Sequence, residues 1–318
     1  MMELAIKPAP FLFSELRLAM AAQHFLTLND LDKHDIHGIV KRAIELKKAA
    51  HKYDDRLAGK TLALIFDKPS TRTRVAFEVA MTQLGGSSLF LSNADSQLGR
   101  GESIEDSARV LSRMVDCIAI RTFEHKNLQR FAEMSSVPVI NALTDSFHPC
   151  QLLADVQTYI EHQGDIAGKT VAWVGDGNNM CQSYINAAAV FDFELKIACP
   201  AGFNPDDELV AAHKTRVQIV PTPSDAVSNA DLVVTDVWTS MGQEQELQQR
   251  QASFGQYQVN NKLMSLANND ALFMHCLPAQ RGEEVSAELL DGPNSVVWDE
   301  AENRMHSQKA LLEFLCTN

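Results

Sequence analysis

The sequence predicts an α/β protein with two doubly wound domains, each a mostly parallel sheet with helices on both faces. Three observations support this prediction. Short, continuously apolar runs alternate with helical patterns, the runs fall into two series along the chain, and 318 residues exceed what one core usually holds. Strands of a parallel sheet are buried on both faces, so they appear as continuous apolar runs rather than as alternating ones.

The expected strands follow one another in chain order. The first series comprises residues 61–66, 87–91, 117–120 and 137–140. The second series comprises residues 170–174, 195–199, 217–220, 231–235 and 271–274. Helical patterns lie between them, at residues 75–84, 103–114, 151–162 and 182–191.

A long helical pattern ending near Gly164 separates the two series, so we expect one domain over residues 1–160 and another over residues 161–318. A final helix, at about residues 303–316, follows the last strand, and we expect it to pack back on the first domain. The first 22 residues contain neither a signal-peptide core nor the composition of a targeting peptide, and their pattern indicates no function.

Composition excludes several classes of partner. The net charge of −13 disfavours nucleic acid and anionic lipid, and no apolar run approaches the ~20 residues of a membrane helix. The six cysteines form no CxxC pair and no cluster with zinc spacing, so we expect no metal site and a cytoplasmic location. Six arginines nevertheless gather within fifty residues, which indicates either surface ion pairs or an anion site: Arg72, Arg74, Arg100, Arg109, Arg113 and Arg121.

The loop after the first strand has the features of a phosphate site. Pro69 interrupts the chain, and Ser70 or Thr71 caps the helix that follows. A helix amino terminus offers free N–H groups and partial positive charge, to which the Thr73 hydroxyl and the Arg72 guanidinium add charge-assisted bonds. The alternative is an ordinary capped helix with surface arginines.

The loop after residues 170–174 excludes a nicotinamide dehydrogenase. Gly175 and Gly177 suggest a dinucleotide fingerprint, but that fingerprint requires a third glycine where this chain has Met180. We therefore expect no organic cofactor.

The segment Ser70–Arg74 resembles the carbamoyl phosphate signature of the aspartate and ornithine carbamoyltransferases. Further segments match the family in the same order over about residues 24–316. They are Gln97–Ser103, Arg121, His148–Gln151, Asn178–Asn179, Asp236–Gly242, His275–Pro278 and Ala301–Arg304. Two positions depart from the family: Asp67 stands where Glu is usual, and Glu300 where Gln is common.

The resemblance implies how the donor substrate is bound. Carbamoyl phosphate would contact Ser70, Thr71, Arg72, Thr73, Gln97, Arg121, His148, Gln151, Cys276, Leu277 and Arg304. The catalytic residues would be Arg121, His148, Asp236 and Cys276. Gln97 would reach the site of a neighbouring subunit, which implies a homotrimer with active sites at its interfaces.

The resemblance also implies the acceptor. The run D-x-x-x-S-M-G, present here as Asp236–Gly242, is specific to the ornithine enzymes, and an aspartate enzyme would have His-Pro-Leu-Pro at residues 275–278. Ornithine would bind Asn179, Asp236, Ser240 and Met241. The alternatives are carbamoyltransferases for putrescine, acylated ornithine or aspartate, and a non-catalytic ligand-binding relative. The sequence does not indicate whether the role is anabolic or catabolic.

Overall fold

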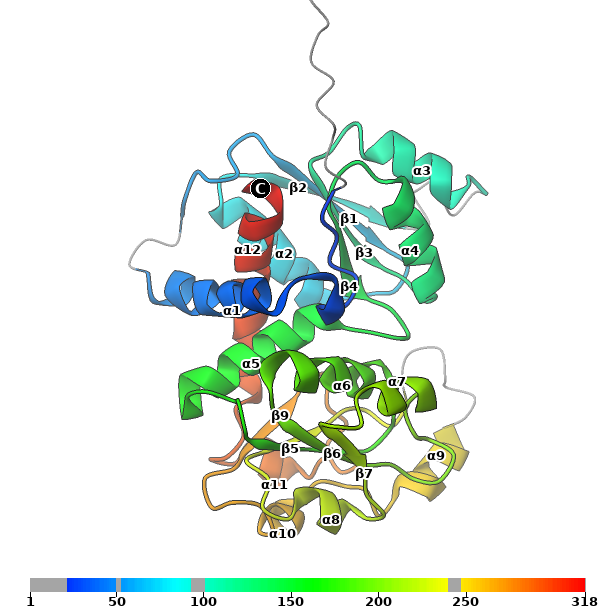
Figure 1. Cartoon of the computed structure of the whole chain (residues 1–318), viewed down its shortest axis with the longest axis vertical. Helices are drawn as coiled ribbons and strands as arrows, with labels where there is room; N and C mark the ends of the chain where they lie inside the picture. The colour runs from blue at the N-terminus through cyan, green and yellow to red at the C-terminus, as the bar shows by residue number, and fades with distance from the viewer. Residues whose placement is uncertain (1–21, 50–52, 93–100, 240–246, 318) are drawn as a thin grey trace, which may run out of the picture.

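The computed structural model describes residues 22–49, 53–92, 101–239 and 247–317, in two halves each built on one sheet (Figure 1). All strand pairs in both sheets are parallel. The predicted fold class is therefore confirmed. The expected extension at residues 1–22 lies outside the described residues except for its last one.

The first sheet has the strand order β2-β1-β3-β4. Its strands are β1 (Thr61–Phe66), β2 (Ser87–Ser92), β3 (Cys117–Arg121) and β4 (Val139–Leu143). In β1, Leu62 and Leu64 face one buried cluster while Ala63 and Ile65 face another, so apolar side chains are needed on both sides. That double burial explains why the strand is a continuous apolar run.

The second sheet has the order β7-β6-β5-β8-β9. Its strands are β5 (Thr170–Val174), β6 (Glu194–Ala198), β7 (Val217–Ile219), β8 (Leu232–Thr235) and β9 (Leu272–His275). Val171 and Trp173 of β5 belong to the core that is shared with the first half, whereas Ala172 and Val174 face the outer layer of helices. The expected strand ends are off by at most two residues, except that β4 extends three residues further.

Helices cover both faces of each sheet. Those of the first half are the short η1 (Leu28–Asp30), α1 (Lys33–Lys48), α2 (Thr71–Gln83), α3 (Ile104–Leu111), α4 (His125–Met134) and α5 (Pro149–Gln163). Those of the second half are α6 (Asn179–Phe191), α7 (Asp207–Ala212), α8 (Pro223–Val227), α9 (Leu247–Phe254), α10 (Asn261–Met264) and α11 (Ala287–Leu290). α5 lies between the halves (Figure 1).

The last helix, α12 (Val297–Thr317), joins the two halves. It runs from the second half into the first and packs against α5, α1 and α2, as predicted (Figure 1). The expected start near residue 303 is wrong, because the helix begins six residues earlier. Glu300 therefore lies in the first turn of this largely buried helix, and Arg304 lies one turn further along it.

Two other local expectations differ from the structure. No helix was predicted at α1, although its buried residues repeat at helical spacing. α2 begins at Thr71 rather than at residue 75, so Ser70 is its N-cap residue, but the Ser70 side chain makes no capping hydrogen bond. The Gly85 position after α2 has a φ of 81°, which explains the glycine at this helix end.

In the described parts of the chain, no helix combines the length and the apolar character that crossing a membrane requires.

The buried Asn303 should be a main contributor to the attachment of α12. Its Oδ1 accepts from Lys47 Nζ of α1 at 2.8 Å, and its Nδ2 donates to Thr158 Oγ1 of α5 at 2.8 Å. We expect Asn303→Ala to lower the free energy of unfolding by about 2–4 kcal/mol, because it leaves buried polar groups unpaired. Denaturant unfolding would measure this, with the exposed Asn261→Ala as the control at within about 0.5 kcal/mol. Equal losses in the two variants would contradict it.

Candidate active site

The candidate site forms where the carboxyl ends of both sheets meet. The chain after β1, β3 and β4 leaves one edge of the first sheet, and the chain after β5, β8 and β9 leaves one edge of the second. Hydrogen bonds join the two edges. Asn179 Nδ2 donates to Thr144 O at 2.7 Å, and His148 N donates to Ser183 Oγ at 2.7 Å.

Three guanidinium groups converge at this junction. Arg72 comes from the first turn of α2, Arg121 from the end of β3, and Arg304 from α12. Burial and the positive charge of Arg304 lower the pKa of Arg121 to about 10, and burial lowers the pKa of Arg304. The Nε atoms of all three arginines are buried without a hydrogen-bond partner. Like charges held together in this way favour binding of an anion.

The position of Arg121 is set by an irregularity in the sheet. The register between β3 and β4 shifts between Ile120 and Arg121, and bulges of this kind turn a side chain at the end of a strand. Asp67 N donates to Arg121 O at 2.8 Å, which ties the phosphate loop to this strand end. The pairing therefore fixes Arg121 beside the amino terminus of α2.

His148 is a neutral hydrogen-bond donor in this arrangement. Burial and the charges of Arg304 and Arg121 lower its pKa well below the usual value. A nitrogen of Arg304 lies 3.5 Å from His148 Nε2, and a guanidinium can only donate, so the ring proton belongs on Nδ1. Nδ1 is buried and has no partner. Its N–H is therefore available to an oxygen atom of a ligand.

Thr73 and Gln151 complete the first half of the site. The Thr73 hydroxyl accepts from Arg304 at 2.5 Å and keeps its own hydrogen for donation. Gln151 Nε2 donates to Asp155 Oδ1 at 2.8 Å and to Glu300 Oε1 at 2.9 Å, whereas Gln151 Oε1 is buried without a partner. The site thus offers donors for one oxygen atom and an acceptor for an N–H group.

The second half contributes Asp236 and Cys276. Asp236 Oδ2 accepts from Asn178 Nδ2 at 2.8 Å, and Oδ1 accepts from Cys276 Sγ at 3.1 Å and from Val237 N at 2.8 Å. Burial and the charge of Asp236 raise the pKa of the Cys276 thiol well above its usual value. Cys276 is therefore a neutral donor, and Asp236 is the acceptor.

Asp236, His275 and Cys276 are the one group of potential metal ligands that the described residues bring within 4.8 Å of each other. They do not fit a metal ion, because their ligand atoms are already engaged. His275 Nε2 lies 3.0 Å from Glu284 Oε1, and its Nδ1 accepts from Leu277 N at 2.9 Å. These contacts hold Leu277 at a φ of 56°, which a leucine rarely adopts and which occurs mainly at constrained functional turns.

The structure brings most of the predicted site residues together. Ser70 and Thr71 stand at the amino terminus of α2, and Asn179 at that of α6. Gln97, Ser240 and Met241 lie outside the described residues. Of the clustered arginines, Arg74 and Arg109 instead pair with Glu78 and Asp106 on their own helices, as in the alternative of surface ion pairs.

Four buried residues that contact the site were not predicted from the sequence to take part in it. Asp155 and Glu300 hold Gln151, Tyr184 OH donates to Asp155 Oδ2 at 2.7 Å, and Glu284 holds His275. Asp155 follows Gln151 by one helical turn within an otherwise apolar stretch of α5. That spacing was the one available signal.

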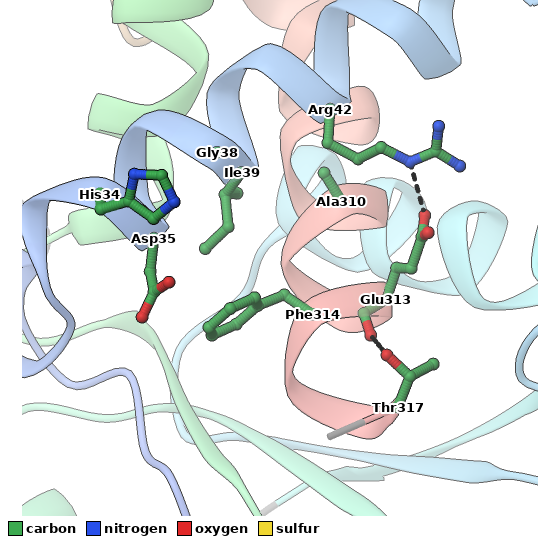
Figure 2. Close-up of a pocket in the computed structure, with 9 residues that line it drawn as sticks. All are labelled: His34, Asp35, Gly38, Ile39, Arg42, Ala310, Glu313, Phe314 and Thr317. Atoms are coloured by element: carbon green, nitrogen blue, oxygen red, sulfur yellow. Dashed lines mark hydrogen bonds and ion pairs between the residues drawn. The ribbon is translucent and has the colours of Figure 1, made fainter.

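A cavity elsewhere in the molecule contains none of the predicted residues. It has about 260 Å³ and lies between α1 and α12, where Phe314 and the Arg42–Glu313 ion pair border it (Figure 2). A smaller cavity of about 160 Å³ lies beside β1 and α4, and Asp67, one of the two departures from the family pattern, lines it. Neither cavity competes with the polar junction as the reaction site.

Comparison with known proteins identifies family models for both halves. Residues 23–161 match the carbamoyl-P binding domain of aspartate/ornithine carbamoyltransferase, and residues 167–315 match its Asp/Orn binding domain.

Whole proteins match as well. The chain is 64% identical to the ornithine carbamoyltransferase of Nitrosococcus oceani over 93% of this chain and 98% of that protein. It is 64% identical to the one of Methylococcus capsulatus over 94% and 100%. Among solved structures, the ornithine carbamoyltransferase of Burkholderia thailandensis superposes with a TM-score of 0.86 at 52% identity, covering 92% of this chain and 98% of that one. The enzyme of Pyrococcus furiosus gives 0.87 at 47% identity, covering 92% and 96%.

The neutral state of His148 gives a prediction for its titration. Because its folded pKa lies below the ordinary value, about 6.5, the unfolded chain takes up a proton that the folded chain does not, and His148 lowers stability as the pH falls below about 6.5. We expect its ring to stay neutral, with the proton on Nδ1, from pH 8 down to pH 5.5. Nitrogen NMR of histidine-labelled protein would measure this, with His148→Asn to assign the signal. A midpoint near 6.5 would refute the assignment.

Proposed function

The chain belongs to the aspartate/ornithine carbamoyltransferase family, and we propose that the junction of its two sheets is where carbamoyl phosphate gives its carbamoyl group to ornithine. The reaction forms citrulline and phosphate, in arginine metabolism. The observation that carries the assignment is the set of buried, unpartnered groups: three guanidinium nitrogens, a His148 N–H and a Gln151 carbonyl. Together they match a phosphate, a carbonyl oxygen and an amide.

The donor is bound by the first half and α12. The amino terminus of α2, with Ser70, Thr71, Arg72 and Thr73, receives the phosphate, because free N–H groups and partial positive charge meet there. The remaining ligands are Arg121, His148, Gln151, Cys276, Leu277 and Arg304, with Gln97 supplied by a neighbouring subunit. Arg304 reaches the donor only because α12 crosses between the halves.

Catalysis needs orientation and stabilisation of the oxyanion. The amine attacks the carbonyl carbon and negative charge develops on the carbonyl oxygen. The C–O bond to phosphate then breaks, and the attacking nitrogen loses one proton to the departing phosphate. Arg121, the His148 N–H and the Thr73 hydroxyl donate to that oxygen. Removing one such donor typically costs about 10²–10³ in rate, and holding the two reactants together can contribute about 7–11 kcal/mol.

The acceptor amine must be neutral when it attacks, although its free pKa is about 10.4. Asp236 directly follows β8 at the carboxyl edge of the second sheet, where it is buried. It can pair with the ammonium group that develops on the acceptor. Since Cys276 already donates to Asp236, the thiol orients this carboxylate rather than removing a proton. The α-amino acid end of ornithine binds Asn179, Ser240 and Met241.

Assembly and location follow the same reasoning. We propose a homotrimer with active sites at its interfaces, two domains that divide near residue 160, and action in the cytoplasm without nucleic acid or membrane as partner. The two family-model ranges, 23–161 and 167–315, support the division, and the net charge of −13 supports the exclusions.

Acceptor choice tests the function directly. We expect citrulline from carbamoyl phosphate and ornithine, with kcat/KM for putrescine, N-acetylornithine and aspartate lower by about 10³ or more, because groups placed for one substrate stay unpaired with another. An assay of carbamoylated product with the four acceptors in parallel measures it. Turnover of another acceptor at a similar rate would overturn the roles of Asp236, Ser240 and Met241. No turnover by folded protein would favour a non-catalytic relative.

A subunit-mixing experiment tests whether Gln97 acts in trans. Gln97→Ala and Arg121→Ala should each be nearly inactive, because each removes a donor ligand. After the two proteins are dissociated and reassembled together, mixed trimers contain sites with both native residues, and activity should return to a sizeable fraction of the wild-type value. Reassembly of each variant alone is the control. No recovery in the mixture would show that Gln97 serves its own subunit.

A further inference from the structure

Two buried carboxyl groups stand behind Gln151 without a cationic partner. Asp155 of α5 and Glu300 of α12 are each 1% exposed, and neither belongs to an ion pair within the described residues. Three protein groups make four hydrogen bonds to them: the Gln151 amide donates to both, Tyr184 OH to Asp155, and His275 N to Glu300 at 2.9 Å. Two negative charges in so dry a place would repel strongly, so one carboxyl group is expected to keep its proton.

We infer that Glu300 and Asp155 share one proton, and that this acid pair fixes which end of the Gln151 amide faces the donor substrate. The inference rests on the proposed function, since it assigns Gln151 to the carbamoyl group. Glu300 and Asp155 are positioning residues in this scheme, because they act through Gln151 and do not touch the substrate.

The amide orientation follows from counting donors and acceptors. Both N–H bonds of Gln151 Nε2 are used, one to each carboxyl group. The shared proton lies in the hydrogen bond between Glu300 and Asp155, so reversing the amide would set its oxygen against carboxyl oxygens that have no hydrogen to donate to it. Gln151 Oε1 must therefore point the other way, where it is buried and unpartnered. An unpartnered acceptor at that position selects a donor substrate with an N–H group, such as a carbamoyl group, over one with a methyl group.

The surrounding charges place the proton on Glu300. Burial and the charge of Asp155 raise the pKa of Glu300 well above its usual range, and Arg304, one turn further along α12, lowers it by less. Burial raises the pKa of Asp155 to about 6, against hydrogen bonds from Gln151, Tyr184 and Glu300. Cys276 and the backbone of His275 face Glu300 from the end of β9, and the Cys276 thiol stays neutral. The pair therefore carries a single charge near pH 7.

This arrangement gives meaning to the departure at position 300. Glutamine is common there in the family, and a neutral glutamic acid resembles glutamine in having a donor end and an acceptor end. Glutamine does not titrate, whereas Glu300 stays protonated only because the folded protein raises its pKa. The contribution of Glu300 to stability therefore depends on pH.

The first test examines the proton itself. Glu300 in the unfolded chain loses its proton above about pH 4.3, whereas the folded chain retains it, so Glu300 lowers stability increasingly as the pH rises above that value. The melting temperature of Glu300→Gln relative to wild type should therefore rise from pH 5 to pH 8. The control is Glu133→Gln, an exposed position on α4 that forms no ion pair within the described residues, and its difference from wild type should stay constant.

Infrared spectroscopy gives an independent reading of the same proton. Wild type at pH 8 should show the C=O stretch of a protonated carboxylic acid, which Glu300→Gln lacks. An ionised Glu300 would instead give no such band and would make Glu300→Gln destabilising at every pH, and that result would overturn the inference.

The second test examines the amide orientation. In Asp155→Asn/Glu300→Gln, Gln151 is free to reverse, so kcat/KM for carbamoyl phosphate should fall about 10- to 100-fold below that of Glu300→Gln. Acetyl phosphate carries a methyl group in place of the amide, and its Ki relative to the carbamoyl phosphate KM should drop about tenfold in the double variant. An unchanged ratio in a folded, active double variant would refute the orienting role. Wild type that fails to use carbamoyl phosphate would instead refute the proposed function, and the infrared band would still decide the proton.

Discussion

The convergence of Arg72, Arg121 and Arg304 is the constraint on which the site depends. Three cations are held at one junction, and their buried Nε atoms have no partner. The packing of α12 on α1, α2 and α5 offsets the repulsion among these cations and places Arg304 in the first half. The same charges, together with burial, keep His148 neutral, and its Nδ1 is left without a partner. An anionic donor substrate relieves this repulsion, so binding energy and orientation have one origin.

Around this cationic centre, burial keeps several titratable groups neutral. Burial keeps the Cys276 thiol and the His148 ring uncharged, and the Asp155–Glu300 pair holds a proton in our interpretation. Neutral groups have a defined donor and acceptor side, which a free carboxylate lacks. The orientation of these donors and acceptors therefore allows the site to discriminate an amide nitrogen from an oxygen or a methyl group, because the groups are buried and do not reorient with solvent.

The two halves meet through polar contacts as well as through apolar packing. The shared core includes side chains from both sheets and from α1, α5 and α12. Asn303 adds hydrogen bonds to α1 and α5, and the acid pair adds a link between α5, α12 and β9. Glu300 and Arg304 lie one turn apart on α12, and in our proposal Glu300 acts on the carbamoyl side of the substrate through Gln151 while Arg304 binds its phosphate. A single buried helix thus couples folding of the two halves to assembly of the site.

The sequence by itself determined the alternation of strands and helices, the parallel sheets and the identity of the loops that carry the chemistry. These features depend on local periodicity and on residue types at strand ends, which the chain displays directly. The family resemblance already named Arg72, Arg121 and Arg304 as ligands of one substrate, but only the tertiary structure showed that their guanidinium groups converge, while Arg74 and Arg109 pair on their own helices. It also decided the early start of α12 and the meeting of Asp155 with Glu300. The convergence of the three arginines and the meeting of Asp155 with Glu300 depend on burial and on contacts between distant parts of the chain, which local patterns do not encode.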